Sequence, residues 1–141
     1  MRCITVDDDA ISRELIREYI TDTPELEMLG EFASAIEANN FLSKNHVDLI
    51  FLDVEMPKMT GLELLKSLDE KPLIILTTSK EKYAIEAFEN EVLDYLIKPI
   101  DYARFIKAVN KAKNTLRPMP VDSFANDSIF IKVDSGLIIL P

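Results

Sequence analysis

Residues 48–61 read DLIFLDVEMPKMTG and predict a buried strand that ends in a carboxylate. The apolar run over residues 49–52 is typical of a strand that helices cover on both faces of a parallel sheet. Asp53 follows this run, and Pro57 and the Thr60-Gly61 pair turn the chain before a helix predicted over 62–68. Because ligands of open α/β sheets bind beyond the carboxyl ends of the strands, we interpret Asp53 as the reactive group.

Strands and helices alternate on both sides of this stretch. Apolar runs predict strands over 2–6, 28–32, 73–76 and 94–97. Helical periodicity predicts helices over 10–20, 80–90 and 102–116, and another that begins after Ser34. Five repeats of strand and helix predict one α/β domain, a five-stranded parallel sheet with helices on both faces.

The composition is that of an ordinary globular protein with an acidic surface. The chain has 141 residues, 48% of them hydrophobic and 29% charged, and a formal net charge of −9. Residues 1–116 hold 14 Lys and Arg against 22 Asp and Glu, so their net charge is −8. Such an acidic body is a poor nucleic-acid surface, because that binding depends on Lys and Arg neutralising phosphates. Any contact with DNA must come from another part of the protein.

Cysteine content and hydropathy predict a cytoplasmic protein. Cys3 is the single cysteine and lies in the first predicted strand, so we expect a small buried hydrophobic residue in a reducing compartment. No apolar run approaches the about 18 residues of a membrane span, and the N-terminus does not resemble a signal peptide. We expect no membrane contact.

The character of the sequence changes after Leu116. Residues 117–127 are polar and contain two prolines, which predicts a linker. Apolar runs over 129–133 and 137–140 flank Asp134-Ser135-Gly136, a pattern that indicates a hairpin. Two strands are marginal alone, so residues 128–141 are expected to begin a further domain that is incomplete here.

Polar residues follow four of the predicted strands, and they indicate phosphoryl chemistry. Asp7 and Asp8 follow the first strand, Asp53 the third, Thr78 the fourth and Lys98 the fifth. Carboxylates crowded at one sheet edge call for a cation, and oxygen ligands suit Mg²⁺. Lys98 and the Thr78 hydroxyl complement an incoming phosphoryl group, and a carboxylate nucleophile can form an acyl phosphate.

These motifs together resemble the receiver domain of two-component response regulators over residues 1–116. The resemblance rests on Val6-Asp7-Asp8, Phe51 to Pro57, Thr78-Ser79 and Tyr95 to Pro99. It implies a flavodoxin-like fold with strand order 2-1-3-4-5, and phosphorylation of Asp53 by a sensor histidine kinase. It also implies a Mg²⁺ site made of Asp7, Asp8, Asp53 and the backbone carbonyl of Glu55. Lys98 would pair with the phosphoryl group.

The resemblance further implies a conformational switch. Thr78 and Tyr95 would form the switch pair, altering the face built from the fourth helix, the fifth strand and the fifth helix. That face usually forms a homodimer in receivers. The family also implies a cis Lys98–Pro99 bond and a phosphoacceptor that assists its own phosphorylation and dephosphorylation, without being a turnover enzyme.

Part of the sequence is similar to receivers that carry a LytTR-type DNA-binding domain. The similarity covers residues 81–88 and 92–100, and residues 129–140 are compatible with the first strands of that output domain. The implied protein is a transcription regulator that contacts DNA through its output domain. Ser79 departs from the family pattern, which usually has Ala at this position.

Alternative interpretations remain for several residues and for the function of the protein. Thr78 or Thr77 can simply complete a strand, Tyr95 can be a packing residue, and Lys98 can be a surface lysine. The acids at positions 7–9 can mark a helix start. An aspartate-nucleophile phosphatase is the alternative function, although the second Asp of its motif is missing. A flavin-binding module of the same topology would need hydroxyls and amides in the loop after the first strand to bind a phosphate. This loop contains acids instead, which argues against a flavin.

Overall fold

The computed structural model describes residues 1–116, in which strands and helices alternate. Each predicted strand is present and is followed by helical structure. In chain order the elements are β1 (Arg2–Val6), α1 (Ala10–Thr21), β2 (Glu27–Phe32), α2 (Ala35–Leu42), β3 (Leu49–Asp53), α3 (Gly61–Ser67), β4 (Leu73–Thr78), the 3-10 helix η1 (Glu81–Tyr83), α4 (Ala84–Glu89), β5 (Asp94–Ile97) and α5 (Tyr102–Leu116).

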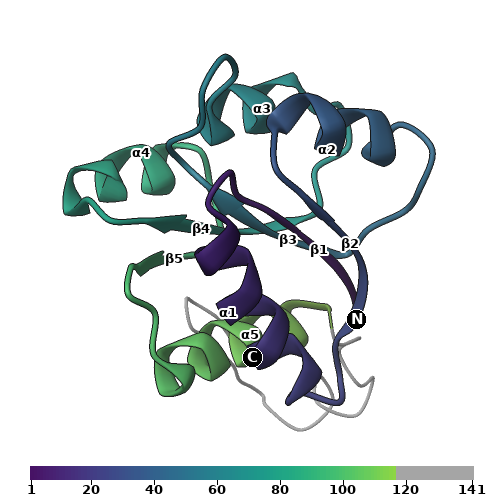
Figure 1. The fold of residues 1–141 in the computed structure, drawn as a ribbon, viewed down its shortest axis with the longest axis vertical. Coiled ribbons are helices and arrows are strands. Elements are labelled where there is room, and N and C mark those ends of the chain that lie inside the picture. The colour runs from purple at the N-terminus through teal and green to yellow at the C-terminus, as the bar shows by residue number, and fades with distance from the viewer. Residues whose placement is uncertain (117–141) are drawn as a thin grey trace, which may run out of the picture.

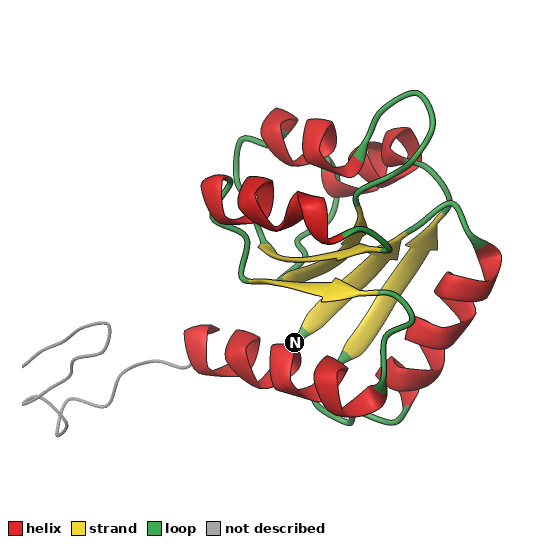
Figure 2. Ribbon diagram, turned by 90° about the vertical axis from the view of Figure 1, so that its left-hand side faces the viewer, coloured by secondary structure: helices red, strands yellow, loops and turns green. Residues whose placement is uncertain are grey.

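The strands form one parallel sheet in the order β2-β1-β3-β4-β5, which confirms the predicted flavodoxin-like fold (Figure 1). The chain adds β2 on one side of β1 and then crosses to the other side for β3. Strand order therefore reverses between β1 and β3, the place where α/β sheets open a ligand crevice. The strands run toward the same edge (Figure 2), so the predicted site residues meet there.

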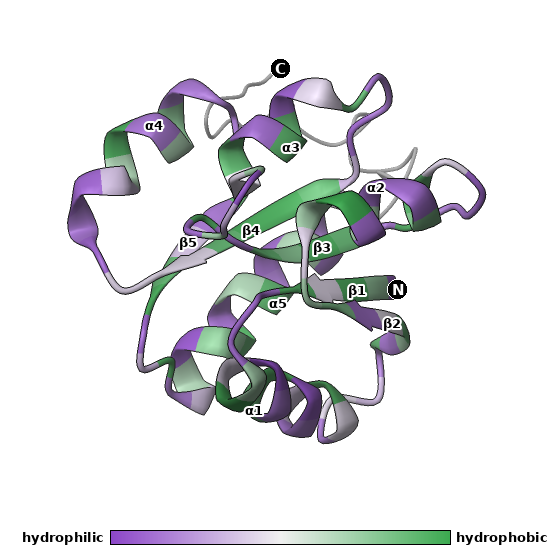
Figure 3. Ribbon diagram, turned by 45° about the horizontal axis from the view of Figure 1, so that its top comes forward, coloured by the Kyte–Doolittle hydropathy of each residue, from purple (hydrophilic) through white to green (hydrophobic). Residues whose placement is uncertain are grey.

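Helices cover both faces of the sheet, with α2, α3 and α4 on one side and α1 and α5 on the other (Figure 1). Side chains of a strand alternate between faces, so Ile50 and Leu52 pack toward α2, α3 and α4, whereas Leu49 and Phe51 pack toward α1 and α5. Figure 3 shows hydrophobic residues along the central strands and hydrophilic ones on the outer turns of the helices. Burial on both faces explains the unbroken apolar run that leads to Asp53.

Side-chain caps start the helices at the edge where the strands end. Asp9 accepts a hydrogen bond from the backbone N–H of Ser12 at the start of α1, and Ser34 does the same for α2. Thr60 and Glu63 form a reciprocal capping box at α3. Asp101 accepts from the N–H of Arg104 at the start of α5. The caps of α1 and α3 end the two loops that begin beside Asp7, Asp8 and Asp53.

Two elements differ from the prediction. The helix expected over 80–90 is divided into η1 and a short α4, and neither segment has a side-chain hydrogen bond at its N-cap. Glu91 follows the end of α4 with a φ of 58°. β4 continues to Thr78, two residues further than predicted, because Thr77 and Thr78 extend the ladder with β5.

Several smaller expectations can be compared directly with the structure. Cys3 is fully buried, as predicted, and burial raises the pKa of its thiol to about 12. The Lys98–Pro99 bond is cis. None of the helices in residues 1–116 has the length and apolarity needed to cross a bilayer. The predicted linker over 117–127 and the predicted start of an output domain over 128–141 lie outside the described residues.

Candidate functional site

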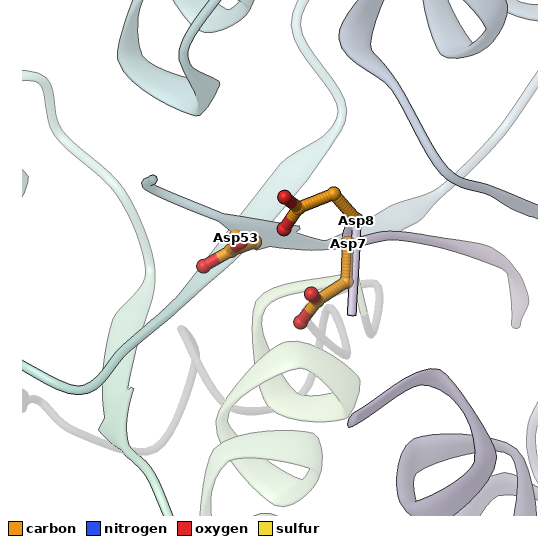
Figure 4. A group of neighbouring side chains, drawn as sticks. All are labelled: Asp7, Asp8 and Asp53. Carbon is orange, nitrogen blue, oxygen red and sulfur yellow. The ribbon is translucent and has the colours of Figure 1, made fainter. Parts of the chain in front are cut away.

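The strand ends bring the predicted acids into one group. Asp7 and Asp8 follow β1, and Asp53 is the last residue of the neighbouring strand β3. One carboxylate oxygen from each of the three residues lies within 4.8 Å of the others. Figure 4 shows these side chains side by side, two from one chain segment and one from the adjacent strand. Asp7 and Asp53 are buried, while Asp8 is exposed and leaves an approach from solvent.

The donor set of this group suits a hard divalent cation. The three residues supply only carboxylate oxygens, which are the ligands of Mg²⁺ and Ca²⁺, and the group contains no sulfur or imidazole for a softer metal. Mg²⁺ is usually held by one or two carboxylates together with waters and substrate oxygens. The residues present therefore fit a Mg²⁺ ion.

The charge on Asp53 is disfavoured by its surroundings. Burial and the neighbouring carboxylate of Asp7 raise the pKa of Asp53 from its ordinary value of 3.8 to about 7, against the opposing influence of Lys98. The side chain is only 5% exposed, so we regard desolvation as a large contribution. A cation bound to the three acids would favour the ionised form that acts as a nucleophile.

Lys98 lies at the sheet edge where the sequence placed it, and it contacts two of the acids. Its Nζ lies 2.9 Å from Oδ2 of Asp7 and 3.4 Å from Oδ1 of Asp53. Burial would lower the pKa of Lys98, but the hydrogen bond to Asp7 and the charge of Asp53 outweigh it, and the pKa is raised. The lysine is therefore charged and is held directly against the candidate nucleophile.

Thr78 and Tyr95 lie on neighbouring strands but differ in their surroundings. Thr78 is buried at the end of β4, and its hydroxyl accepts a hydrogen bond of 3.1 Å from the N–H of Lys80. Tyr95 is half-buried in β5, and its side chain packs against the core beneath α2, α3 and α4. Both positions are compatible with the predicted switch pair, and the roles themselves stay a prediction.

Two contacts at the site were not predicted from the sequence pattern. Gly61 lies so close to the backbone of Asp53 that a Cβ on it would stand 2.1 Å from the carbonyl oxygen of Asp53. Glu55 pairs with Lys80 at 2.9 Å and accepts a longer hydrogen bond of 3.5 Å from the hydroxyl of Tyr83. The loops after β3 and β4 are thus joined beside the acids, a contact between residues far apart in the chain.

Comparison with known families gives one match that covers most of the chain. The family model described as "Response regulator receiver domain" matches residues 3–110. The matched range includes the three acids, Thr78, Tyr95 and Lys98.

Curated relatives extend this similarity to longer proteins. The chain is 35% identical over 129 residues to a response regulatory protein of Shewanella oneidensis, covering 90% of this chain and 55% of the relative. It is 36% identical over 115 residues to the transcriptional regulatory protein BtsR of Escherichia coli, covering 80% of this chain and 48% of the relative. The chain thus spans about half the length of these relatives.

Solved structures of similar fold come from regulators as well. The response regulatory domain of protein mrkE from Klebsiella pneumoniae is 31% identical with a TM-score of 0.76, covering 82% of this chain and 97% of that one. The REC domain of AraT, a response regulator from Geobacillus stearothermophilus, is 37% identical with a TM-score of 0.74, covering 82% and 94%.

Proposed function

This chain belongs to the family of response regulator receiver domains, and on that premise we propose that Asp53 accepts a phosphoryl group from a sensor histidine kinase in a Mg²⁺-dependent reaction. The observation that carries the proposal is the cluster at the sheet edge. Three carboxylates converge there, and Lys98 is bound to two of them. We place this exchange in the cytoplasm, where the kinase presents its phosphorylated histidine.

The proposed transfer forms an acyl phosphate. A carboxylate oxygen of Asp53 bonds to phosphorus, and the imidazole of the kinase leaves with the electron pair of the broken P–N bond. The ammonium of Lys98 lies 3.4 Å from Asp53, so it can pair with an oxygen of the arriving group after a small movement. The Thr78 hydroxyl accepts from the N–H of Lys80 and keeps its own hydrogen for a phosphoryl oxygen.

The metal belongs to the same proposal. Asp7, Asp8, Asp53 and the backbone carbonyl of Glu55 would hold Mg²⁺. When bound, the ion neutralises negative charge on the phosphoryl oxygens during transfer. The raised pKa of Asp53 supports this assignment, because an acid crowded in this way needs a cation before it can react in its ionised form.

The proposed output of phosphorylation is a change at the face formed by α4, β5 and α5. Thr78 would move toward the phosphoryl group and Tyr95 would turn inward, and the altered face would form a homodimer. Two large apolar side chains exposed on α4, Ile85 and Phe88, support a contact at this face.

We further propose that the full protein regulates transcription through a LytTR-type DNA-binding domain that begins at residue 128. Two observations support this: a curated relative is named a transcriptional regulatory protein, and the match covers only 48% of that relative's length. The acidic receiver would then contact DNA only through that domain, because its own net charge of −8 repels phosphates.

Labelling with a small phosphodonor tests the central proposal. Wild-type protein incubated with acetyl phosphate and Mg²⁺ should gain one phosphoryl group by intact mass, and the Asp53→Asn variant should gain none. Removing Mg²⁺ with EDTA should reduce the labelling of the wild type strongly. Equal labelling of the two proteins would contradict the assignment of Asp53.

The same preparation tests whether the chain acts as a phosphoacceptor rather than as an enzyme. We expect at most slow release of phosphate from its own acyl phosphate, with one phosphoryl group transferred per chain. Repeated turnover of a small phosphate ester that depends on Asp53 would favour the aspartate-nucleophile phosphatase instead.

A further inference from the structure

Asp8 reaches the acid cluster without a side-chain hydrogen bond of its own among the described residues, so its backbone must set its direction. The peptide between Asp8 and Asp9 is held by the side chain of Asp7, whose Oδ1 accepts a hydrogen bond of 2.9 Å from the N–H of Asp9. The peptide that precedes Asp8 is held by Arg13, whose Nη1 donates to the carbonyl oxygen of Asp7 at 2.6 Å. Both peptide planes beside Asp8 are therefore fixed.

Asp7 and Arg13 form the fixed side of the site. The N–H of Asp7 donates to the carbonyl of Phe32 at 3.0 Å, and its two carboxylate oxygens accept from Asp9 and Lys98. Its carbonyl oxygen, bound by Arg13, is the fourth anchored group. A hydrogen bond from a charged guanidinium is stronger than a neutral one, so this contact is a firm constraint on the loop.

Arg13 is itself held in place from the neighbouring strand. Its Nε lies 4.0 Å from Glu31 of β2, and Glu31 also accepts two hydrogen bonds from Arg17, one turn further along α1. Arg13 is largely covered, whereas Arg17 is half exposed. Arg17 shares Glu31 with Arg13 but forms no hydrogen bond to the loop of residues 7–9.

We propose that Arg13 is a positioning residue of the metal site, holding the Asp7–Asp8 peptide so that the Asp8 carboxylate faces Asp53. This role rests on the proposed Mg²⁺ site. Outer partners that orient metal ligands typically change metal affinity by about 10- to 100-fold when they are removed. The sequence places Arg13 on the polar face of a helix, with nothing to indicate a contact with the loop.

The sign of the effect separates positioning from charge. Arg13 is a cation bound to the backbone carbonyl of Asp7, next to the acid cluster, so replacing it with a neutral residue should by electrostatics alone strengthen the binding of a second cation. Loss of positioning has the opposite effect. Weaker Mg²⁺ binding by Arg13→Gln therefore identifies the geometric role.

Calorimetric titration of EDTA-stripped protein with MgCl₂ tests this role without phosphorylation. We expect Arg13→Gln to bind Mg²⁺ about 10-fold more weakly than wild type. Arg13→Lys keeps a charged donor on a long side chain that can reach the Asp7 carbonyl, whereas the Gln amide ends short of the position of Nη1, so the Lys variant should bind Mg²⁺ more tightly than the Gln variant. The matched control Arg17→Gln should stay within about twofold of wild type, since it makes no contact with Asp7.

A metal-free measurement separates positioning from misfolding. In EDTA, the backbone amide NMR signals of Asp8 and Asp9 should shift in Arg13→Gln and remain in place in Arg17→Gln, while signals of α4, on the opposite face of the sheet, stay unchanged in both. Mg²⁺ binding by Arg13→Gln as tight as wild type, or a Lys variant no tighter than the Gln variant, would overturn the role of Arg13. If the wild-type protein binds no Mg²⁺, the proposed metal site itself, on which the role of Arg13 rests, would be overturned.

Discussion

Asp53 is where opposing electrostatic influences meet. Burial and Asp7 act against its ionisation, and Lys98 acts for it, with a net rise of the pKa to about 7. The unfolded chain would ionise this group near 3.8. Folding therefore binds a proton to Asp53 between these two values, and the folded state loses stability as that proton is removed.

Asp53→Asn should reveal this loss in EDTA. The contribution of Asp53 to wild-type stability should fall as the pH rises from about 4 to about 7, whereas the variant has no proton to lose at this position. The free energy of unfolding of the variant should therefore increase relative to that of the wild type over this range. At pH 8 the variant should be more stable by about 2–4 kcal/mol, measured by urea unfolding.

An exposed acid supplies the control for that measurement. Hydrogen bonds from Ser12 lower the pKa of Asp9, so this carboxylate favours folding when it is ionised. Asp9→Asn should not gain stability relative to wild type as the pH rises. A stability difference between Asp53→Asn and wild type that does not change with pH would contradict the raised pKa.

At the scale of elements, β5 and α5 are joined by a buried ion pair. Asp94, at the start of β5, is 8% exposed and accepts two hydrogen bonds from Arg104 of α5, at 2.8 and 2.9 Å. Arg104 also donates to the carbonyl of Tyr95 at 3.0 Å, and Lys111 lies 3.5 Å from Asp94. Burial would raise the pKa of Asp94, but the hydrogen bonds from Arg104 and the Tyr95 backbone lower it.

Removing Arg104 should leave a buried carboxylate poorly compensated. We expect Arg104→Gln to lower the free energy of unfolding at pH 7 by about 1–3 kcal/mol, a range reduced because Arg104 itself is partly exposed. Lys107→Gln, an exposed position on the same helix, should change it by less than about 0.5 kcal/mol.

A double-mutant cycle completes this test. Asp94→Asn combined with Arg104→Gln should be less destabilised than the sum of the single variants, because the second change removes the uncompensated charge. Strict additivity in urea unfolding would mean that the pair does not couple β5 to α5.

For the whole molecule, charge is distributed unevenly across the proposed output face. α4 carries Glu86 and Glu89 and no basic residue, whereas α5 carries four basic residues and no acid. Phe88 is 84% exposed and Ile85 is 70% exposed beside these charges. In a two-fold dimer, α4 of one copy can face α5 of the other, so the apolar contact and the opposite charges favour the same pairing.

Sedimentation velocity can measure this pairing. With Mg²⁺ and the phosphoryl analogue beryllofluoride, the wild type should associate, and Phe88→Lys should weaken the association at least about tenfold by placing a charge in an apolar contact. Ile36→Lys, on the exposed side of α2, is the matched control and should associate like wild type. A wild type that stays monomeric at high concentration would contradict dimerisation through this face.

The sequence alone determined the fold class and the members of the acid cluster. Unbroken apolar runs identify strands buried on both faces, and parallel strands must present their carboxyl ends at one edge, so Asp7, Asp53 and Lys98 could be assigned to one site before any coordinates. The caps Ser34 and Asp101 could also be read locally, because a capping side chain bonds to backbone only a few residues away.

The tertiary structure alone decided how that cluster is supported. Arg13 binds the carbonyl of Asp7, Glu55 pairs with Lys80, and Gly61 allows the backbone of Asp53 to approach. Each of these contacts depends on how a loop, a helix and a strand pack together. Periodicity and local propensity describe neighbours along the chain, so they identify which residues reach the edge of the sheet, but not which side chains hold them there.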